Sequence, residues 1–407
     1  MMIRAFALCD KLSSGRLALL REDRRNAIYH RILDLNASLL EKRRDQLFDP
    51  GLFLQENHCR TLAVDVSVES SDYIFRFLPG ISRHPVDFIS ISSAEKGISA
   101  DGYLFWGIPK TLRSLFAVRM APKPVLFVEG GLLASIGVPC DSNLPMEYRC
   151  ITSFLADDIS IYYNGGFPSR LELLLESDLE ITEEQKKRAR QLIDRIIANK
   201  LSKYNHQPME MPRPLVTRRP RVLVVDQRYG DQSIAFGCAD DNTFERMLRA
   251  AIEENPGADI WVKTHPHSKV DRASCFRTAY FDHLQPHDRV IPIRESINPQ
   301  TLIQEADKVY VVTSQVGYEA LLCGKEVHVF GYPFFAGWGL TRDRIHSHRR
   351  TKKRSLEELF YIVNILYARY VHPETSRACE MEEIVDYLLK MRERYFASGD
   401  RNRRRVA

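Results

Sequence analysis

Residues 308–330 read KVYVVTSQVGYEALLCGKEVHVF, and this stretch decides the fold class. It begins with a continuous apolar run at 309–312, which is typical of a strand buried on both faces. Thr313 or Ser314 is a suitable cap for the helix that follows. Gly324 ends that helix, and a second apolar run follows at 327–330. The stretch therefore predicts a strand, a short helix and another strand of a parallel sheet.

The same alternation extends upstream to residue 221. Apolar runs at 221–225, 259–263 and 289–291 predict strands, and helices are predicted at 243–254 and from Pro299 onward. Strands that alternate with helices predict a doubly wound parallel sheet. The Pro-rich stretch 207–220 before them predicts a linker.

A second α/β unit is predicted before the linker. Apolar runs at 62–66, 88–91, 103–106 and 125–128 predict a parallel sheet, and a charged helix is expected at 182–203. The helices predicted at 356–369 and 381–395 have no strand partners in this interpretation. The expected organisation is a helical accessory region (1–60), a first Rossmann-like domain (61–206), the linker (207–220), a second Rossmann-like domain (221–345), and C-terminal helices with a basic tail (346–407).

Length and composition agree with two globular domains. A chain of 407 residues is longer than a single core usually supports, and 44% hydrophobic with 27% charged residues is ordinary for a folded protein. No apolar run is long enough to span a membrane and the N-terminus lacks signal-peptide features, so a cytoplasmic location is expected. Eight cysteines without paired spacing predict reduced thiols and no structural metal.

The positive charge is concentrated in two runs, at 342–354 and 401–405. The favoured interpretation is solvated surface. Attraction to the anionic inner membrane is the alternative, because each basic residue near such a surface contributes about 1 kcal/mol. Nucleic acid is not expected as a partner, because no stacking aromatic residues are interleaved with the basic ones.

Polar residues follow several of the predicted strands. Asp226 and Gln227 end the strand 221–225, where a carboxylate would project into the crevice of the sheet. The alternative is that Asp226 caps the next turn. Asp231 lies within a Gly-containing turn, which favours a structural role.

The strand 259–263 ends in Lys263, Thr264, His265 and Pro266. Pro266 holds the preceding residue extended, so His265 is expected to be presented to a ligand phosphate or carboxylate, with Lys263 as a second cation. A structural histidine is the alternative.

The helix that begins after Thr313 and Ser314 is a candidate anion site, because its free backbone amides and its dipole face the crevice. Glu319 lies a little over one turn along, near the ligand end, where it is expected to accept ribose hydroxyls. A solvated helix carboxylate is the alternative.

In the first half, Glu129 ends a buried strand before Gly130 and Gly131, which permit close approach of a ligand. Glu129 is expected to face Asp226 across the cleft. A solvated carboxylate at a strand end is the alternative.

Together these residues resemble the capsule polysaccharide biosynthesis family, the KpsC/KpsS-type retaining β-Kdo glycosyltransferases. The resemblance runs through Trp106-Gly107, EGGLLASIG at 129–137, DDISIYY at 157–163, Asp226-Gln227, KTHP at 263–266, TSQVGYEA at 313–320 and YPFFAGWGLT at 332–341. It implies a GT-B fold, in which two Rossmann-like domains enclose a cleft. It also implies CMP-β-Kdo as donor and a lipid-linked capsule or related glycan as acceptor, with the inner-membrane surface and capsule assembly proteins as further partners.

The resemblance implies a role for each matched residue. Retention requires two successive inversions through a covalent sugar–enzyme adduct, with Asp226 as nucleophile and Glu129 as acid/base. The residues expected to bind the CMP-sugar are Lys263, His265, Pro266, Thr313, Ser314, Gln315 and Glu319. Those expected in the acceptor site or cleft are Gly130, Gly131, Tyr163, Gln227 and Trp338. CMP leaves with a single phosphate, so no cofactor or metal ion is expected.

The sequence departs from the family pattern at three positions. Gly130 stands in place of an Asp, Ala134 of an Arg, and Asn164 of an Asp. Two alternative functions therefore stay open: a sugar-nucleotide epimerase of the same fold, and a non-catalytic capsule assembly protein.

Overall fold

The computed structural model describes residues 55–65, 86–90, 100–107, 123–139, 143–211, 219–265 and 279–403, together with Asp49 and Asp141. The accessory region predicted at 1–60 lies almost entirely outside these residues. Pro266 and the middle of the predicted linker also lie outside them.

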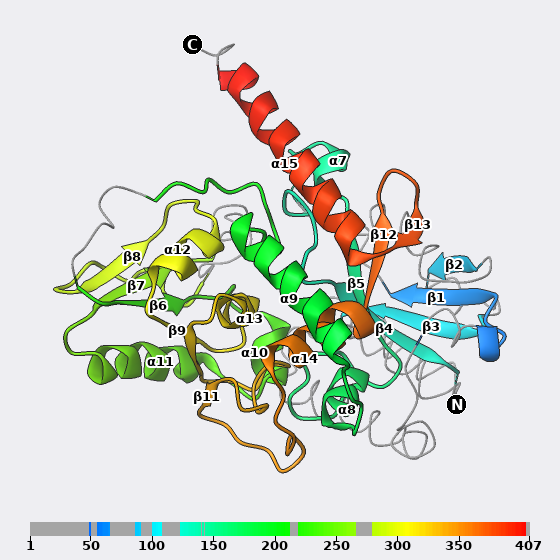
Figure 1. The fold of residues 1–407 in the computed structure, drawn as a ribbon, viewed down its shortest axis with the longest axis horizontal. Coiled ribbons are helices and arrows are strands. Elements are labelled where there is room, and N and C mark those ends of the chain that lie inside the picture. Colours follow the sequence, from blue (N-terminus) through cyan, green and yellow to red (C-terminus); the bar gives the residue numbers. More distant parts are fainter. Residues whose placement is uncertain are drawn as a thin grey trace, which may run out of the picture.

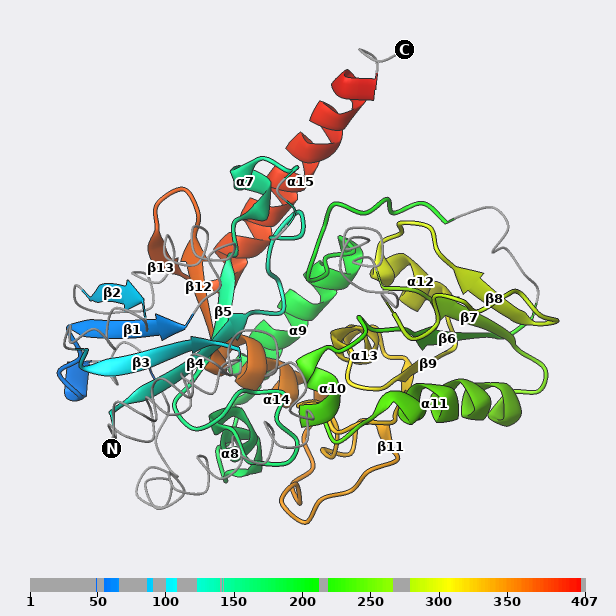
Figure 2. The ribbon, with the colours of Figure 1, turned by 180° about the vertical axis from the view of Figure 1, so that it is seen from behind.

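Two sheets lie side by side (Figures 1 and 2). The first contains seven strands in the order β13-β12-β5-β4-β3-β1-β2, and the pairs among β1, β2, β3 and β4 are parallel. Its strands are β1 (Thr61–Asp65), β2 (Asp87–Ser90), β3 (Gly102–Trp106), β4 (Val125–Gly130), β5 (Ser153–Asp157), β12 (Ala368–His372) and β13 (Arg377–Cys379).

The second sheet contains six strands in the order β11-β10-β9-β6-β7-β8, and every pair in it is parallel. Its strands are β6 (Arg221–Val225), β7 (Asp259–Lys263), β8 (Val290–Ile293), β9 (Lys308–Val311), β10 (Glu326–Val329) and β11 (Arg342–Asp343). Strand order reverses between β6 and β9, the position at which ligands bind in doubly wound sheets.

The helices connect these strands and cover the sheets. They are α7 (Met146–Arg149), α8 (Arg170–Glu176), α9 (Glu183–Ala198), α10 (Gln232–Phe236), α11 (Asp241–Glu254), α12 (Pro299–Glu305), α13 (Gln315–Leu322), α14 (Leu356–Phe360), the π-helix η5 (Tyr361–Tyr367) and α15 (Met381–Arg403). Figure 1 shows α9 crossing between the two halves and α15 extending away from the body.

The mixed α/β class and the predicted strands of the second sheet are confirmed, with ends shifted by three residues or fewer. The prediction of a purely parallel first sheet is wrong. Strand β5 was not predicted, and it pairs antiparallel with β4 and with β12. An antiparallel pair needs no helical crossover, and among the described residues between β4 and β5 only α7 is helical.

The prediction that the C-terminal helices have no strand partners is also wrong. After α14 and η5 the chain returns to the first sheet, where β12 pairs with β5 and β13 pairs with β12. The return is anchored at η5, because the Tyr367 hydroxyl donates to Asp157 Oδ2 (2.8 Å) at the end of β5. The helix expected at 182–203 ends at Ala198, with Lys200 in the left-handed region at φ +50°.

One hydrophobic core cluster joins the two halves. It includes Leu132 and Leu174 from the first half and Trp261, Tyr318 and Phe335 from the second. A backbone hydrogen bond crosses the same boundary, from Gly165 N to Phe236 O (2.7 Å). The halves are therefore packed together over an extended area.

The basic run 342–354 is only partly the solvated surface that was favoured, because Arg342, Arg344 and Lys353 are exposed whereas other cations of the run are engaged within the fold. Arg350 is 7% exposed, pairs with Glu172, and donates to the carbonyls of Pro333 (2.6 Å) and Ala336 (2.7 Å). Arg354 donates to the last carbonyls of α8, including Leu175 O (2.9 Å). Cations are favourable at the C-terminal end of a helix, so this run holds the second half against α8.

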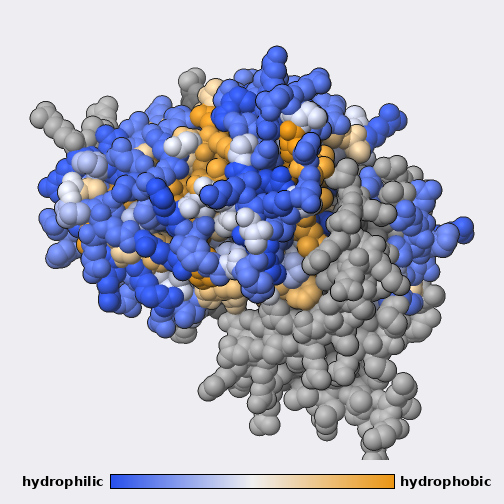
Figure 3. All heavy atoms as spheres, turned by 60° about the horizontal axis from the view of Figure 1, so that its bottom comes forward, coloured by the Kyte–Doolittle hydropathy of each residue, from blue (hydrophilic) through white to orange (hydrophobic). Residues whose placement is uncertain are grey.

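None of the described helices combines the length and the apolar character needed to span a membrane. Figure 3 shows a face of the molecule on which hydrophilic residues predominate and hydrophobic ones are confined to bands near its middle. Phe396 is the one large hydrophobic side chain that is exposed among the described residues.

Candidate functional site

Gln227 and Thr313 hydrogen-bond to each other between the ends of β6 and β9, where strand order reverses. Gln227 Nε2 donates to Thr313 Oγ1 (3.0 Å), and Thr313 N donates back to Gln227 Oε1 (2.9 Å). Ser233 Oγ lies 3.2 Å from Thr313 Oγ1. Because Gln227 and Thr313 are buried, they fix the strand ends together and do not line an open cleft.

Asp226 does not have the geometry expected of a nucleophile. Its side chain is 1% exposed, and its carboxylate accepts three backbone N–H bonds, from Gln227 (2.8 Å), Tyr280 (3.0 Å) and Phe281 (3.0 Å). Burial raises the pKa of Asp226 to about 7, against the lowering effect of these amides. The alternative, an Asp226 that caps the next turn, describes the bond from Gln227, whereas Tyr280 and Phe281 belong to a segment distant in the sequence.

Lys263 is likewise engaged within the fold. It is 9% exposed, and its ammonium donates to the carbonyls of Thr264 (2.8 Å) and Glu295 (3.2 Å). It is therefore a structural cation and not an exposed phosphate ligand. His265 follows β7 and is half-buried.

The N-terminus of α13 is formed as expected, with Ser314 as the cap that accepts from Val316 N (3.3 Å). Gln315 and Glu319, on this helix, contact the first half. Gln315 Nε2 donates to Leu132 O (2.8 Å), and the Ser202 hydroxyl donates to Glu319 Oε1 (2.9 Å).

Glu319 is 5% exposed, and burial raises its pKa to about 7 although Ser202 and the Lys203 backbone donate to it. Glu319 therefore links α13 to Ser202 of the first half, whereas the sequence predicted that it would bind the ribose of the donor.

Four residues meet where the ends of β3 and β4 face α10. A Cβ placed on Gly107 would lie 3.3 Å from Glu129 Oε2, 3.5 Å from the Tyr163 hydroxyl and 3.6 Å from Gln232 Oε1. The Tyr163 hydroxyl is 3.5 Å from Gln232 Oε1. Gly107 has φ +73°, so a side chain there would be strained and would also fill this space. Residues from both halves thus surround one small region, which we call the junction site.

Charged groups extend the junction site. Burial raises the pKa of Tyr162 to about 12; Lys203 opposes the shift, and Glu129 and Asp231 add to it. Burial would lower the pKa of Lys203, but Tyr204, Tyr162, Glu129 and Asp231 together raise it above its usual value. One carboxylate from each half, Glu129 and Asp231, therefore contributes to the raised pKa values of the same two side chains, Lys203 and Tyr162. Asp231 also caps α10, since Oδ1 accepts from Ser233 N (2.8 Å).

The two glycines after Glu129 have different surroundings. Nothing lies within 4 Å of a Cβ placed on Gly130, whereas one on Gly131 would meet the Ser153 side chain. Gly131 is therefore required for packing, and Gly130 borders open space beside Glu129.

Trp338 does not lie in the cleft as expected. It is 0% exposed, donates from Nε1 to Phe334 O (2.8 Å), and its ring faces the Arg350 guanidinium at 5.5 Å.

Sequence reasoning missed Lys203, Gln232 and the site role of Gly107, and it gave Asp231 only a structural role. Lys203 was assigned to the helix before the linker. Asn199, a residue common at helix ends, was the available signal that the helix stops earlier. No local signal marks Gln232, because its proximity to Tyr163 depends on how the halves pack.

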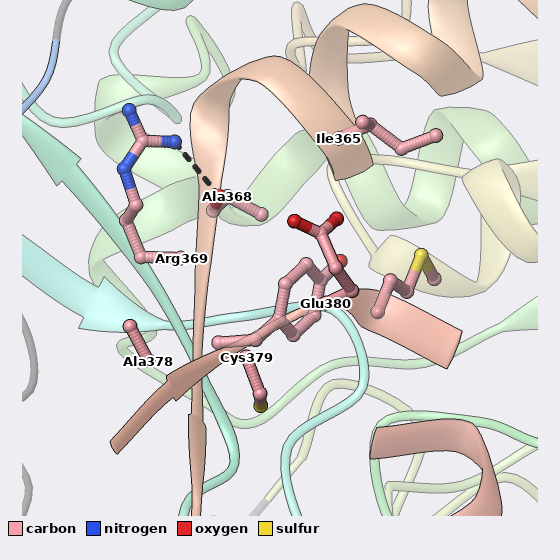
Figure 4. A pocket seen from close by; sticks show the side chains of 8 residues that line it. Ile365, Ala368, Arg369, Ala378, Cys379 and Glu380 are labelled. Atoms are coloured by element: carbon pink, nitrogen blue, oxygen red, sulfur yellow. Dashed lines mark hydrogen bonds between the residues drawn. The ribbon is translucent and has the colours of Figure 1, made fainter. Parts of the chain in front are cut away.

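A pocket of about 160 Å³ lies elsewhere, between η5, the β12–β13 hairpin and the start of α15. Figure 4 shows Arg369 turned toward Ala368, to whose carbonyl it donates (2.9 Å). Glu380, on the pocket wall, pairs with Arg188. The pocket contains no residue of the junction site. Within the described part of the chain, no group of His, Cys, Asp or Glu side chains is arranged to hold a metal ion.

Residues 128–372 match the family model described as capsule polysaccharide biosynthesis protein. The chain is 38% identical to the capsule polysaccharide modification protein LipA of Neisseria meningitidis, over 84% of this chain and 48% of LipA. It thus spans about half the length of that curated relative.

Two solved structures are similar to this chain. Both come from KpsC of Thermosulfurimonas dismutans. The one described as a β-Kdo 2,4 transferase is 36% identical, with a TM-score of 0.70 over 81% of this chain and 98% of that chain. The one described as a β-Kdo 2,7 transferase is 26% identical, with a TM-score of 0.58 over 81% and 99%.

Proposed function

Because the chain belongs to the capsule polysaccharide biosynthesis family, we propose that it is a GT-B glycosyltransferase that transfers Kdo from CMP-β-Kdo with retention. The observation that carries the proposal is the junction site. There, Glu129 and Tyr163 of the first half meet Gln232 of the second. The 36% identity to a solved β-Kdo 2,4 transferase supports the same donor sugar.

The donor nucleotide is proposed to bind at the second sheet. The eight-residue helix α13 directs its first backbone amides and its positive dipole end toward the reversal point, which favours an anion. Ser314, Gln315 and His265 are partly exposed members of the expected donor set. Because Gln315 is engaged with Leu132 O, Ser314 and His265 are assigned to the CMP phosphate. We propose that no divalent cation takes part, since CMP leaves with a single phosphate, and that chelation with EDTA leaves the rate unchanged.

Retention is proposed to proceed by two inversions. A carboxylate oxygen attacks the anomeric carbon of Kdo while the bond to the phosphate oxygen breaks and CMP departs with the electron pair. The acceptor hydroxyl then gives its proton to Glu129 and attacks the same carbon, which releases the carboxylate. Glu129 suits this role because it is half-buried and is the last residue but one of β4, at the junction site.

Asp231 is the better nucleophile candidate than Asp226. Asp231 is half-buried and directly precedes Gln232, whose Oε1 lies 3.5 Å from the Tyr163 hydroxyl at the junction site. Asp226 is enclosed by three backbone amides. A nucleophile and an acid/base must flank one anomeric carbon, so we assign the adduct to Asp231.

The acceptor is proposed to be a lipid-linked capsule or related glycan, reached from the cytoplasmic side of the inner membrane, with capsule assembly proteins as further partners. Gly130 and Asn164, which replace acids of the family pattern, are neutral. Open space beside Gly130 supports an acceptor subsite next to Glu129.

The test is intact-mass spectrometry of the protein incubated with CMP-Kdo and a panel of lipid-linked acceptors. We expect CMP release and a transferred Kdo residue. Glu129→Gln should accumulate protein carrying one Kdo, because attack by the acceptor is slowed. Asp231→Asn should bind CMP but form no adduct, with turnover reduced at least about 10³-fold.

Asp226→Asn is the matched control, because it makes the same chemical change five positions away. Asp226→Asn should lower the free energy of unfolding, and the protein that remains folded should still form the adduct with Kdo. An adduct in Asp231→Asn, or its specific loss in Asp226→Asn, would reverse the assignment. Absence of CMP binding by the wild-type protein would remove the transferase proposal altogether.

A further inference from the structure

We propose that the space in front of Gly107 is the subsite for the attacking hydroxyl of the acceptor, and that Tyr163 donates a hydrogen bond to that hydroxyl. This inference rests on the proposed function. It names the group of the acceptor that the junction site takes and a further residue that orients it.

Three side-chain oxygens converge on this space. A Cβ placed on Gly107 would lie 3.3 Å from Glu129 Oε2, 3.5 Å from the Tyr163 hydroxyl and 3.6 Å from Gln232 Oε1. Because Gly107 carries no side chain, an atom of a ligand can approach all three oxygens from the position that a side chain would occupy.

The backbone holds the walls of this space. Gly107 N donates to Val128 O (2.8 Å), beside the end of β4. On the other side, Gly165 N donates to Phe236 O (2.7 Å), which ties the loop after Tyr163 to α10. The oxygens are therefore held in place relative to one another before a ligand binds, as an orienting site requires.

The side chains are directed toward the same space. Glu129 Oε1 accepts from the backbone N–H of Gly130 (3.0 Å), and Oε2 is the carboxylate oxygen that faces Gly107. The Tyr163 hydroxyl lies 3.5 Å from Gln232 Oε1, which is longer than the roughly 2.5–3.0 Å of a usual O–H···O hydrogen bond. A ligand oxygen at the usual distance would therefore compete successfully with Gln232 for the Tyr163 hydrogen.

The lining oxygens favour a ligand group that donates a hydrogen bond. A carboxylate and an amide oxygen only accept, and a tyrosine hydroxyl does both. A hydroxyl fits, because it can donate to Glu129 Oε2 and accept from Tyr163. The donor phosphate does not fit, because its negative charge would lie beside the Glu129 carboxylate and it has no hydrogen to give to Gln232.

The second step of the proposed reaction follows from this placement. The hydroxyl oxygen forms a bond to the anomeric carbon while the bond from that carbon to Asp231 breaks, and the electron pair returns to the Asp231 carboxylate. The hydroxyl proton passes to Glu129 Oε2. Tyr163 donates to the other lone pair of the attacking oxygen, which directs the reacting pair at the carbon. The open space beside Gly130 admits the rest of the glycan.

The experiment separates the two half-reactions by intact-mass spectrometry. CMP-Kdo alone forms the Kdo adduct, and a lipid-linked acceptor added afterwards discharges it. Gly107→Ala fills the space and should slow discharge at least about 100-fold, while the amount of adduct stays within about twofold of the wild type. Tyr163→Phe keeps the ring and should slow discharge about 10- to 100-fold. It also tests the subsite if the alanine variant does not fold.

Gly324→Ala is the matched control. Gly324 has φ +68°, close to the +73° of Gly107, so alanine is similarly strained at both positions. No described atom lies within 4 Å of a Cβ placed on Gly324. Both half-reactions of this variant should stay within about twofold of the wild type.

Three outcomes would overturn the inference or its premise. Discharge at the wild-type rate would remove the subsite if it is found in Gly107→Ala, and the role of the hydroxyl if it is found in Tyr163→Phe. Equal losses of adduct formation and discharge in Gly107→Ala would assign the space to the donor. A wild-type protein that forms no adduct would instead overturn the proposed function.

Discussion

At the scale of single residues, the junction site depends on which positions tolerate a side chain. Gly130 and Gly131 are adjacent at the end of β4, yet one borders open space and the other packs against Ser153. Both have ordinary negative backbone φ angles, since neither is among the glycines with positive φ. The difference between them is therefore one of packing alone.

This difference makes a paired prediction. Gly131→Ala should lower the free energy of unfolding by about 1–3 kcal/mol, because its Cβ forces the Ser153 side chain and backbone apart. Gly130→Ala should change it by less than about 0.5 kcal/mol. Urea denaturation monitored by circular dichroism measures both. Equal losses for the two variants would contradict the packing explanation.

A second prediction concerns the buried carboxyl of Glu319. Burial raises its pKa from 4.5 to about 7, so the folded protein holds a proton that the unfolded chain releases at lower pH. The stability that this group contributes is complete below the unfolded pKa and is lost as pH rises through about 7. The wild-type free energy of unfolding should therefore fall between pH 5 and pH 8, with about 2 kcal/mol from this residue.

Glu319→Gln tests that prediction, since the amide keeps the shape and cannot ionise. Its free energy of unfolding should fall less steeply over the same range, measured by urea denaturation at several pH values. Asp157 and Asp226, whose pKa values burial also raises to about 7, remain in both proteins and so cancel in the comparison. Identical pH slopes would show that Glu319 is already ionised in the folded state.

At the scale of elements, the segment after β11 holds the second half to α8. Arg350 lies 3.8 Å from the centre of the Tyr332 ring and donates from Nε to Glu172 Oε2 (3.0 Å). The long motif at 332–341 is thus folded around a buried guanidinium. The residues of this motif are therefore explained by packing around Arg350, and Trp338 packs against the same guanidinium.

Arg350→Met should therefore be strongly destabilising, by about 3–5 kcal/mol, because it leaves part of a buried ion pair and two carbonyls without their donor. Lys352→Met is the matched control: it removes a contact with Asp178, whose side chain is 94% exposed, and should cost less than about 1 kcal/mol. Chemical denaturation of both variants is the measurement. A small loss for Arg350→Met would mean that solvent replaces its contacts.

At the scale of the whole molecule, the chain returns near its end to the first sheet, to which it adds β12 and β13, and α15 packs against β12. β12 covers the edge of β5, and Val371, Ile384, Val385 and Leu388 are fully buried. Beyond Tyr395 the helix α15 leaves the body, and Phe396, Ala397 and Ser398 are exposed.

Two deletions should therefore behave differently. Removing residues 399–407 should leave the melting temperature within about 2 °C of the full chain, because the deleted segment follows three exposed positions. Removing residues 368–407 should abolish cooperative unfolding, because it exposes the edge of β5 and removes core residues. Thermal unfolding followed by circular dichroism distinguishes them. Cooperative unfolding of the longer deletion would show that the first sheet is stable without β12.

The sequence by itself determined the second sheet almost completely. Its predicted strands are largely apolar runs, and its helices carry their caps in adjacent residues, as Ser314 does for α13. The short β11, Arg342–Asp343, has no apolar run and was not predicted. Such signals are local, so they can be read without knowing the fold. The position of Glu129 at the end of a buried strand was predictable for the same reason.

Only the tertiary structure decided which polar residues are accessible. Asp226 and Asp231 both follow β6, but the backbone of Tyr280 and Phe281, more than fifty positions away, encloses the first. The β12 strand and the charges around Lys203 likewise depend on segments distant in the chain. Burial and electrostatic environment are properties of neighbours in space, and a single sequence specifies those neighbours only once it is folded.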